Sequence, residues 1–229
     1  WHRGRAARYL LRDAAWPPSF DGESLREILR VGIPASLSTL LSNIGIMVLT
    51  GVLARLGTAH LAAYGLGTRL DFLFLSLAYG FGIAVTTLVG LATGARRPEL
   101  VRIYVVRAGL LIVAVLAVPA AGLFFWPTAW LGMFTHDPEI VAVGTQYLRI
   151  IGPSYPLVGI SMLIAFAFQG LGRATTPLVW MAIRVGLVLV AALVCTQVLG
   201  LADRAVFTTV AIGNGLSAVV MLALFFGGT

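Results

Sequence analysis

Charge is scarce in this sequence. Only 11% of the 229 residues are charged, whereas an ordinary soluble domain carries roughly 25%. Apolar residues make up 59% of the chain and its mean hydropathy is +0.95, so there is too little polar surface to face water on all sides. The composition therefore predicts a protein whose surface is largely in contact with lipid.

Lysine is absent, so all sixteen basic residues are arginines, and the net charge is +7. A basic balance is often a sign of nucleic-acid binding. Here, however, the arginines cluster in the N-terminal segment and in the short breaks between apolar runs. That distribution is typical of the cytoplasmic loops of membrane proteins, and we expect no nucleic-acid partner.

Cysteine, histidine and aspartate are too few for several functions. Cys195 is the single cysteine, which excludes a disulfide within the chain, and its apolar setting predicts a packing role. The histidines (His2, His60 and His136) lie at or beyond the ends of apolar runs, and Asp71 is the only aspartate well inside one. An intramembrane protease would need Ser with His, paired aspartates or a metal site within the spans. We therefore expect no enzyme, no cofactor and no metal site.

Long apolar runs, by contrast, are abundant. A helix that crosses roughly 30 Å of hydrocarbon needs about 20 predominantly apolar residues. Six runs reach this length, at about 28–53, 61–93, 103–125, 139–168, 177–199 and 206–226. The alternation that is typical of strands is absent, and a helix satisfies its own backbone in lipid. The sequence predicts an all-α membrane protein, a bundle of six transmembrane helices over residues 28–229, with a cytoplasmic loop and an amphipathic lead-in over residues 1–27.

The arginines also predict the orientation. Ten lie in the N-terminal segment and in the loops that follow the second and fourth runs, whereas two lie in the loops on the other side. Because positively charged loops stay in the cytoplasm, we expect both termini there. The chain begins with Trp1 and an arginine-rich segment, which is typical of an internal loop of a longer protein.

Four charged residues lie well inside the runs, namely Arg69, Asp71, Arg149 and Arg184. Each costs roughly 2.5–3.5 kcal/mol at the centre of a bilayer, so we expect each to face the bundle interior or a water-filled cavity. Arg69 and Asp71 point about 200° apart on a helix and cannot simply pair with each other. Depth favours Arg149 as the partner of Asp71, with Arg184 second. A structural ion pair and a substrate or proton role both remain open.

Polar side chains within the runs complete the candidates for a substrate or ion pathway. These are Asn43, Tyr79, Ser154, Tyr155 and Gln169, and Tyr64 and Asn214 are two further polar residues there. Such residues more often form interhelical hydrogen bonds than ligand contacts. Pro153 and Pro156 are expected to bend the fourth helix, because proline removes a backbone donor.

Four stretches go beyond general hydrophobicity: VGIPASLSTLLSNIGIMVLTGVLARLG (31–57), LAAYGLGTRLDFLFLSLAYGFGIAVTTLVGLATGA (61–95), MFTHDPEIVAVGTQYLRIIGPSYPLVGI (133–160) and FAFQGLGRATTP (166–177). In order and spacing they resemble the C-terminal half of the multidrug and toxic compound extrusion (MATE) family, over nearly the whole chain. That family has twelve helices in two six-helix lobes around a central cavity. The resemblance implies that this chain is one lobe, helices seven to twelve, and that its leading segment joins the lobes.

The resemblance also implies a function, a location and partners. The function is secondary active efflux, by antiport, of cationic or amphipathic compounds across the bacterial cytoplasmic (inner) membrane, driven by a proton gradient in preference to a sodium gradient. The partners are the N-terminal six-helix lobe or a second copy, the lipid bilayer, the small substrate, and H⁺ or Na⁺. Sodium-coupled members carry carboxylates at positions near Ser42 and Val158 of this sequence, and neither of these residues binds a cation by charge.

Two other functions stay open. A lipid-linked oligosaccharide flippase of the same superfamily would favour a strongly cationic cavity, and three mid-span arginines stand against one aspartate. A non-transporting membrane scaffold is the alternative from a different class. Charges inside the membrane weigh against a scaffold, because they cost free energy and a scaffold has no need of them.

Overall fold

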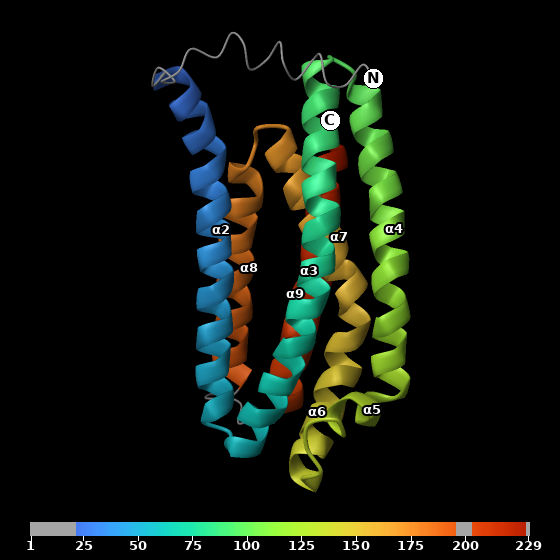
Figure 1. The fold of residues 1–229 in the computed structure, drawn as a ribbon. Coiled ribbons are helices and arrows are strands. Elements are labelled where there is room, and N and C mark those ends of the chain that lie inside the picture. Colours follow the sequence, from blue (N-terminus) through green and yellow to red (C-terminus); the bar gives the residue numbers. More distant parts are fainter. Residues whose placement is uncertain (1–21, 196–202, 228–229) are drawn as a thin grey trace, which may run out of the picture.

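Six helices that are long and apolar enough to cross a membrane run side by side in a computed structural model, which describes residues 22–195 and 203–227 (Figure 1). The prediction of an all-helical six-span bundle is confirmed over these residues. The spans are formed by α2 (Gly22–Ala54), α3 (Thr58–Gly94), α4 (Pro98–Phe125), the α6–α7 pair, α8 (Thr175–Leu193) and α9 (Asp203–Gly227). A short helix, α5 (Pro127–Leu131), joins α4 to the fourth span.

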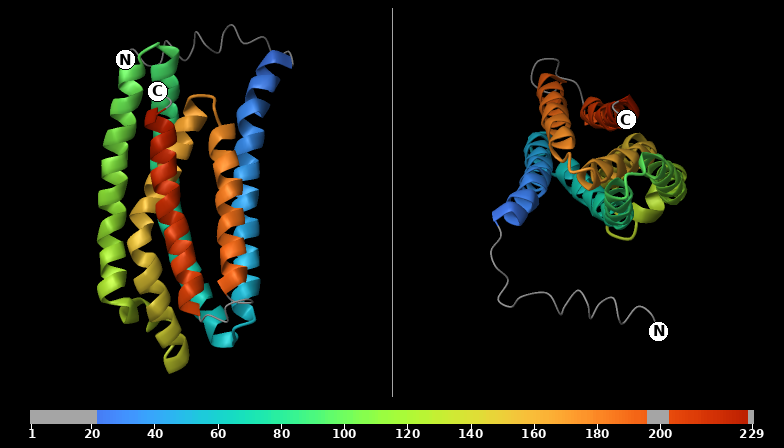
Figure 2. Two further views of the ribbon diagram at one scale, coloured as in Figure 1. Left: turned by 180° about the vertical axis from the view of Figure 1, so that it is seen from behind. Right: turned by 90° about the horizontal axis from the view of Figure 1, so that it is seen from above.

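The helix bounds differ from the predicted runs mainly at their starts. Residues 22–27, expected in the lead-in, already form the first turns of α2, because no helix-breaking residue separates them from the apolar run. Residues 1–21 of the expected inter-lobe loop and residues 196–199 of the fifth run lie outside the described residues. α2 begins and α9 ends at the same end of the bundle (Figures 1 and 2).

The fourth span is interrupted where its prolines predict a bend. α6 (Pro138–Ile151) passes into a 3₁₀ turn, η1 (Gly152–Ser154), and the helix resumes as α7 (Tyr155–Gly170). Pro153 lies within the turn and has no backbone N–H to continue the α-helical hydrogen-bond ladder. The break gives α6 and α7 independent directions, and it places Ser154 and Tyr155 at the middle of the bundle.

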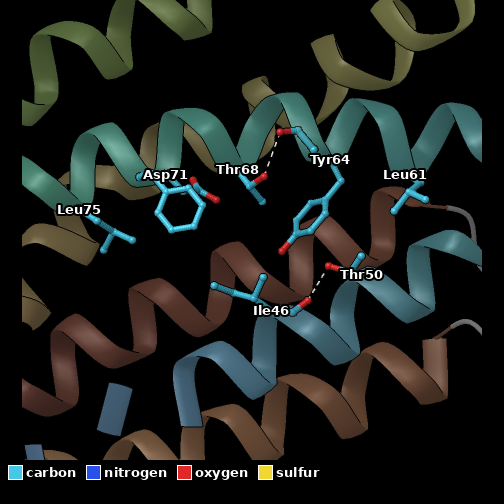
Figure 3. Close-up of a pocket in the computed structure, with 9 residues that line it drawn as sticks. Ile46, Thr50, Leu61, Tyr64, Thr68, Asp71 and Leu75 are labelled. Carbon is cyan, nitrogen blue, oxygen red and sulfur yellow. Dashed lines mark hydrogen bonds between the residues drawn. The ribbon is translucent and has the colours of Figure 1, made fainter. Parts of the chain in front are cut away.

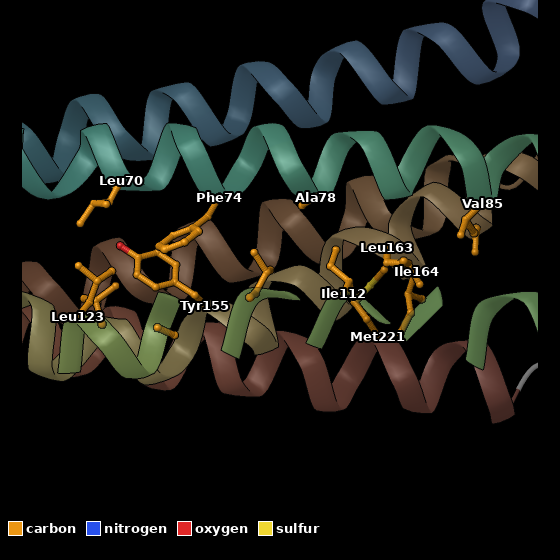
Figure 4. Packing of buried hydrophobic residues seen from close by; sticks show 14 of the residues in the cluster. Leu70, Phe74, Ala78, Val85, Ile112, Leu123, Tyr155, Leu163, Ile164 and Met221 are labelled. Carbon is orange, nitrogen blue, oxygen red and sulfur yellow. The ribbon is translucent and has the colours of Figure 1, made fainter. Parts of the chain in front are cut away.

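The core is built around α3, which packs against α7, α6 and α4. Figure 4 shows Phe74 and Tyr155 facing each other within this buried cluster. Small residues let α3 and α7 approach closely: a side chain at Gly170 would meet the carbonyl oxygen of Thr86, at 2.7 Å from its Cβ. The Thr86 hydroxyl in turn donates to the carbonyl of Phe166 at 2.9 Å.

α2 stands apart from this core. It packs extensively on α8 but only slightly on α3, its neighbour in sequence. The view from above shows α2 and α8 on one side of the bundle and α4 on the other (Figure 2). The loose α2–α3 contact leaves room for a cavity between these two helices.

Candidate functional site

The carboxylate of Asp71, on α3, is held by two phenols from the fourth span. Tyr155 donates its hydroxyl to Oδ1 at 2.7 Å, and Tyr147 donates to Oδ2 at 3.2 Å. Tyr147 lies on α6 and Tyr155 begins α7, so the two donors come from opposite sides of the 3₁₀ turn. Hydrogen bonds to a charged acceptor are stronger than neutral ones, and here each carboxylate oxygen has one.

Aromatic packing fixes the two phenols in place. The Tyr155 ring lies 4.3 Å, centroid to centroid, from Phe74, which is almost one turn beyond Asp71 on α3. The Tyr147 ring makes edge contacts with Tyr64 at 5.8 Å and with Phe207 of α9 at 5.1 Å. Tyr64, Tyr147 and Tyr155 are all buried. Ring contacts therefore hold the two phenols in place, and the polar atoms of the site are surrounded by apolar side chains.

Gly67 is the reason that Tyr147 can reach Asp71. It lies one turn before Asp71 on α3, and a Cβ added to it would lie 2.2 Å from Cε1 of the Tyr147 ring. Any Cβ at this position would overlap the ring. A glycine is needed here for close approach between α3 and α6, rather than for its backbone conformation.

A cavity of about 180 Å³ lies beside this site, between α2 and α3 (Figure 3). Asp71, Tyr64 and Thr68 supply polar groups from α3, and Ile46 and Thr50 face them from α2. Drug-sized ligands occupy roughly 300–1,000 Å³, whereas a water takes about 30 Å³. The cavity therefore has room for an ion and a few waters and not for a drug-sized substrate.

Of the two roles that the sequence leaves open for Asp71, the ion pair with an arginine is not formed within the part of the chain that the structure describes. Among the described residues, no arginine lies within ion-pair distance of Asp71, whose partners are the two phenols. Arg149 is exposed. Arg69 is exposed too, and its guanidinium carbon lies 5.0 Å from the centre of the Phe134 ring, near the α5–α6 connection. The long side chain of Arg69 extends along α3 toward the end of the bundle where α5 lies, as arginines near a membrane interface commonly do.

Only Arg184, of the three mid-span arginines, points into the bundle. Its Nη2 donates to Oδ1 of Asn214 on α9, and Asn214 donates to the Ser154 hydroxyl at 2.8 Å. Ser154 closes the chain by donating to the Ile151 carbonyl at 2.7 Å. The Nε of Arg184 is buried without a hydrogen-bond partner. This second polar cluster ends at Ser154, directly before Tyr155 of the Asp71 site.

The structure thus divides the predicted site residues. Asp71 and Tyr155 meet in one cluster, and Ser154 and Arg184 in another. Asn43 donates within α2 to the Thr39 carbonyl. Tyr79 is 41% exposed and makes an edge contact with the Phe166 ring, and Gln169 is half-buried near the end of α7. None of these three hydrogen-bonds to Asp71 among the described residues.

Sequence reasoning missed Tyr147. A usable signal was present in the spacing: Tyr64 and Asp71 are seven residues apart, and Tyr147 and Tyr155 are eight apart. Both separations are close to two turns of a continuous helix, so the spacing alone would place each pair near one helix face. Two helices that each carry such a polar pair in an otherwise apolar span are expected to pack together, because their polar groups can then form hydrogen bonds with each other.

Taken together, the six spans and the internal carboxylate define a multi-pass membrane protein of transporter architecture. The chain belongs to the MatE family, whose model matches residues 34–194. It is 27% identical over 172 residues to the probable multidrug resistance protein NorM of Thermotoga maritima, covering 75% of this chain and 36% of that protein. It is 30% identical over 160 residues to the multidrug export protein MepA of Staphylococcus aureus, covering 67% of this chain and 34% of that protein.

Solved structures agree on the fold. A mutant of the Vibrio cholerae MATE transporter VcmN superposes with a TM-score of 0.86 at 23% identity, over 97% of this chain and 51% of that chain. A MATE transporter in a bent conformation superposes with a TM-score of 0.82 at 25% identity, over 92% of this chain and 46% of that chain. The chain spans about a third to a half of the proteins it matches, and its fold corresponds to one lobe of a twelve-helix transporter.

Proposed function

We propose that this chain is the C-terminal lobe of an antiporter that exports cationic or amphipathic compounds, and that Asp71 carries the coupling ion within the lobe. The observation that carries the proposal is a carboxylate held between two buried phenols at the wall of an ion-sized cavity. A scaffold has no use for such a group, because an intramembrane carboxylate costs free energy. The multidrug names of the relatives NorM and MepA support the substrate class.

A proton fits this site better than sodium. A sodium ion would need several oxygen ligands, and the two phenol hydrogens already point at the carboxylate oxygens of Asp71. A proton needs only one of those oxygens, and it requires only that a phenol turn from donor to acceptor. The positions near Ser42 and Val158, where sodium-coupled members carry carboxylates, are not acidic here.

We favour the antiporter over an oligosaccharide flippase because of the charges that lie in the interior of this lobe. That alternative rested on three mid-span arginines, of which Arg69 and Arg149 are exposed on the surface of the lobe. Only Arg184 places a cation in the interior. The cavity between α2 and α3 is bordered by an acid and not by arginine.

Ion-coupled transport by the Asp71→Asn variant tests the proposal. The assay is uptake of a fluorescent cation into everted vesicles that contain the protein expressed from its complete reading frame. We expect Asp71→Asn to fold, as judged by expression and gel filtration, and to lose transport. Asp137→Asn is the matched control, since Asp137 caps α6 through the amides of Glu139 and Ile140 and asparagine caps equally well.

Loss of coupling and loss of folding can be told apart in this test. If Asp71→Asn transports like the parent, Asp71 does not carry the coupling ion. If Asp71→Asn fails to fold, Asp71→Glu, which keeps the charge but displaces it from the phenols, is compared with the parent. Efflux that Asp71→Glu retains without any dependence on the proton gradient would also contradict the proposal.

The partner lobe and the orientation belong to the same proposal. We propose an N-terminal six-helix lobe as the partner across a central cavity, with both termini in the cytoplasm of a bacterial inner membrane. Residues 1–229 expressed alone should then give no drug resistance in a susceptible strain, and robust resistance would argue for a functional homodimer. Single cysteines at Arg97 and Asp137, in a variant without Cys195, should label from opposite sides of the membrane.

A further inference from the structure

A second cavity lies at the other end of α3 from Asp71. Its walls are the C-terminal part of α3, with Leu88 and Leu91, and the first turns of α4, with Arg97, Leu100 and Tyr104. Its volume is about 370 Å³, which lies in the range of small-ligand sites, and it opens on the outer surface of the bundle. The groove is apolar along its walls, and its charge is confined to Arg97.

Two arginines, Arg97 and Arg107, lie on the face of α4 that borders this groove, whereas Arg102 lies over the Phe226 ring. Arg97, Leu100, Tyr104 and Arg107 follow one another at spacings of three or four residues, so they share one helix face. Glu99 is offset from Arg97 by about 200° and lies on a different face. Arg97 is also the N-cap residue of α4, and the positive end of the helix dipole adds to its charge.

Arg107 is a second cation on the groove's face of α4. It is exposed on α4, nine residues after Pro98, which is about 14 Å along the helix axis. No ion pair or hydrogen bond to Arg107 is present among the described residues. An unpaired guanidinium at this depth in the bilayer is costly, and its side chain can extend back along the helix toward Tyr104 and the headgroup layer.

We propose that this groove binds an anionic phospholipid. Its phosphodiester lies between Arg97 and Arg107 and accepts from the Tyr104 hydroxyl, and its acyl chain lies along Leu88, Leu91 and Leu100. The apolar walls select a lipid over free phosphate, which would gain nothing from them. Each arginine near an anionic headgroup contributes on the order of fivefold in affinity, so the pair favours an anionic over a zwitterionic lipid by roughly twenty- to thirtyfold.

Native mass spectrometry of the purified protein tests this inference, with phosphatidylglycerol and phosphatidylcholine supplied at equal concentration. The parent should retain phosphatidylglycerol preferentially, and Arg97→Gln/Arg107→Gln should lose most of that preference. Arg26→Gln/Arg55→Gln removes the same charge from exposed sites outside the groove, and it should behave like the parent. Equal retention of the two lipids by the parent, or an unchanged preference in Arg97→Gln/Arg107→Gln, would overturn the inference.

A second variant blocks the groove and leaves both arginines in place, so that the inference does not depend on the folding of the double glutamine variant alone. Ala95 lies in the wall of the groove and is exposed, so Ala95→Trp fills the groove without altering any arginine. It should lose most of the preference for phosphatidylglycerol, as the double glutamine variant does. Added inorganic phosphate should not displace the lipid from the parent; displacement by phosphate at millimolar concentration would identify a free-anion site in place of a lipid site.

Discussion

Tyr155→Phe isolates one hydrogen bond of the Asp71 site. The substitution removes the phenol that donates to Oδ1 of Asp71 at 2.7 Å and leaves the ring, so the contact with Phe74 at a centroid distance of 4.3 Å is retained. Tyr155 is buried, so the substitution leaves Oδ1 of Asp71 without its protein donor. The variant therefore reports the hydrogen bond with little change in packing.

The expected loss follows from the charge on the acceptor. A hydrogen bond to a charged group contributes about 1.5–3 kcal/mol, and a neutral one about 0.5–1.5 kcal/mol. Taking about 2 kcal/mol for Tyr155, the midpoint of thermal unfolding should fall by roughly 4–8 °C for a chain of this size. Tyr147→Phe should have a smaller effect, because its bond to Asp71 is longer, at 3.2 Å.

A double-mutant cycle with Asp71→Asn measures the interaction itself. In the Asp71→Asn background the acceptor is neutral, so Tyr155→Phe should cost about 1 kcal/mol less than in the parent. The assay is thermal or denaturant unfolding in a single detergent, followed by tryptophan fluorescence. Strict additivity of the two substitutions would refute the reasoning, since it would mean that the Tyr155 hydroxyl and the Asp71 carboxylate do not interact.

Two further predictions concern packing and the second polar cluster. Gly67→Ala should destabilise the bundle by about 1–3 kcal/mol, because its methyl group overlaps the Tyr147 ring. The control is Gly80→Ala on the same helix, which meets open space and should be neutral or stabilising. The midpoints of unfolding measure both variants, and equal effects would refute the overlap argument. Asn214→Leu should cost about 3 kcal/mol, because it leaves the buried Arg184 guanidinium with only the weak Met181 sulfur acceptor. Arg184→Met removes that cation, leaves Oδ1 of the buried Asn214 without its donor, and should cost about 1–3 kcal/mol alone. It should also reduce the cost of Asn214→Leu, and an undiminished cost in the double variant would show that Asn214 acts independently of Arg184.

Much of the site could be anticipated residue by residue. Asp71 was singled out because a lone carboxylate in an apolar span is expensive, and the structure places it in contact with other helices as that cost requires. Opposite charge and similar depth favoured Arg149 as the partner of Asp71. Depth along a helix, however, says nothing about the direction in which a side chain points. Tyr147 was overlooked because a single tyrosine in a membrane span is unremarkable until its neighbour on another helix is known.

The amino-acid sequence by itself determined the class of the molecule. Six apolar runs, the scarcity of charge and the distribution of arginine dictate a bundle of six membrane-spanning helices, because backbone groups in lipid must be satisfied within each helix. The tertiary structure decided which polar groups meet. The 3₁₀ turn at Pro153 and the open face of Gly67 bring Tyr155 and Tyr147 to Asp71, and the loose contact of α2 with α3 opens the cavity beside them. These contacts depend on the rotation and approach of whole helices, which hydrophobic runs leave undetermined because lipid solvates every apolar face equally well.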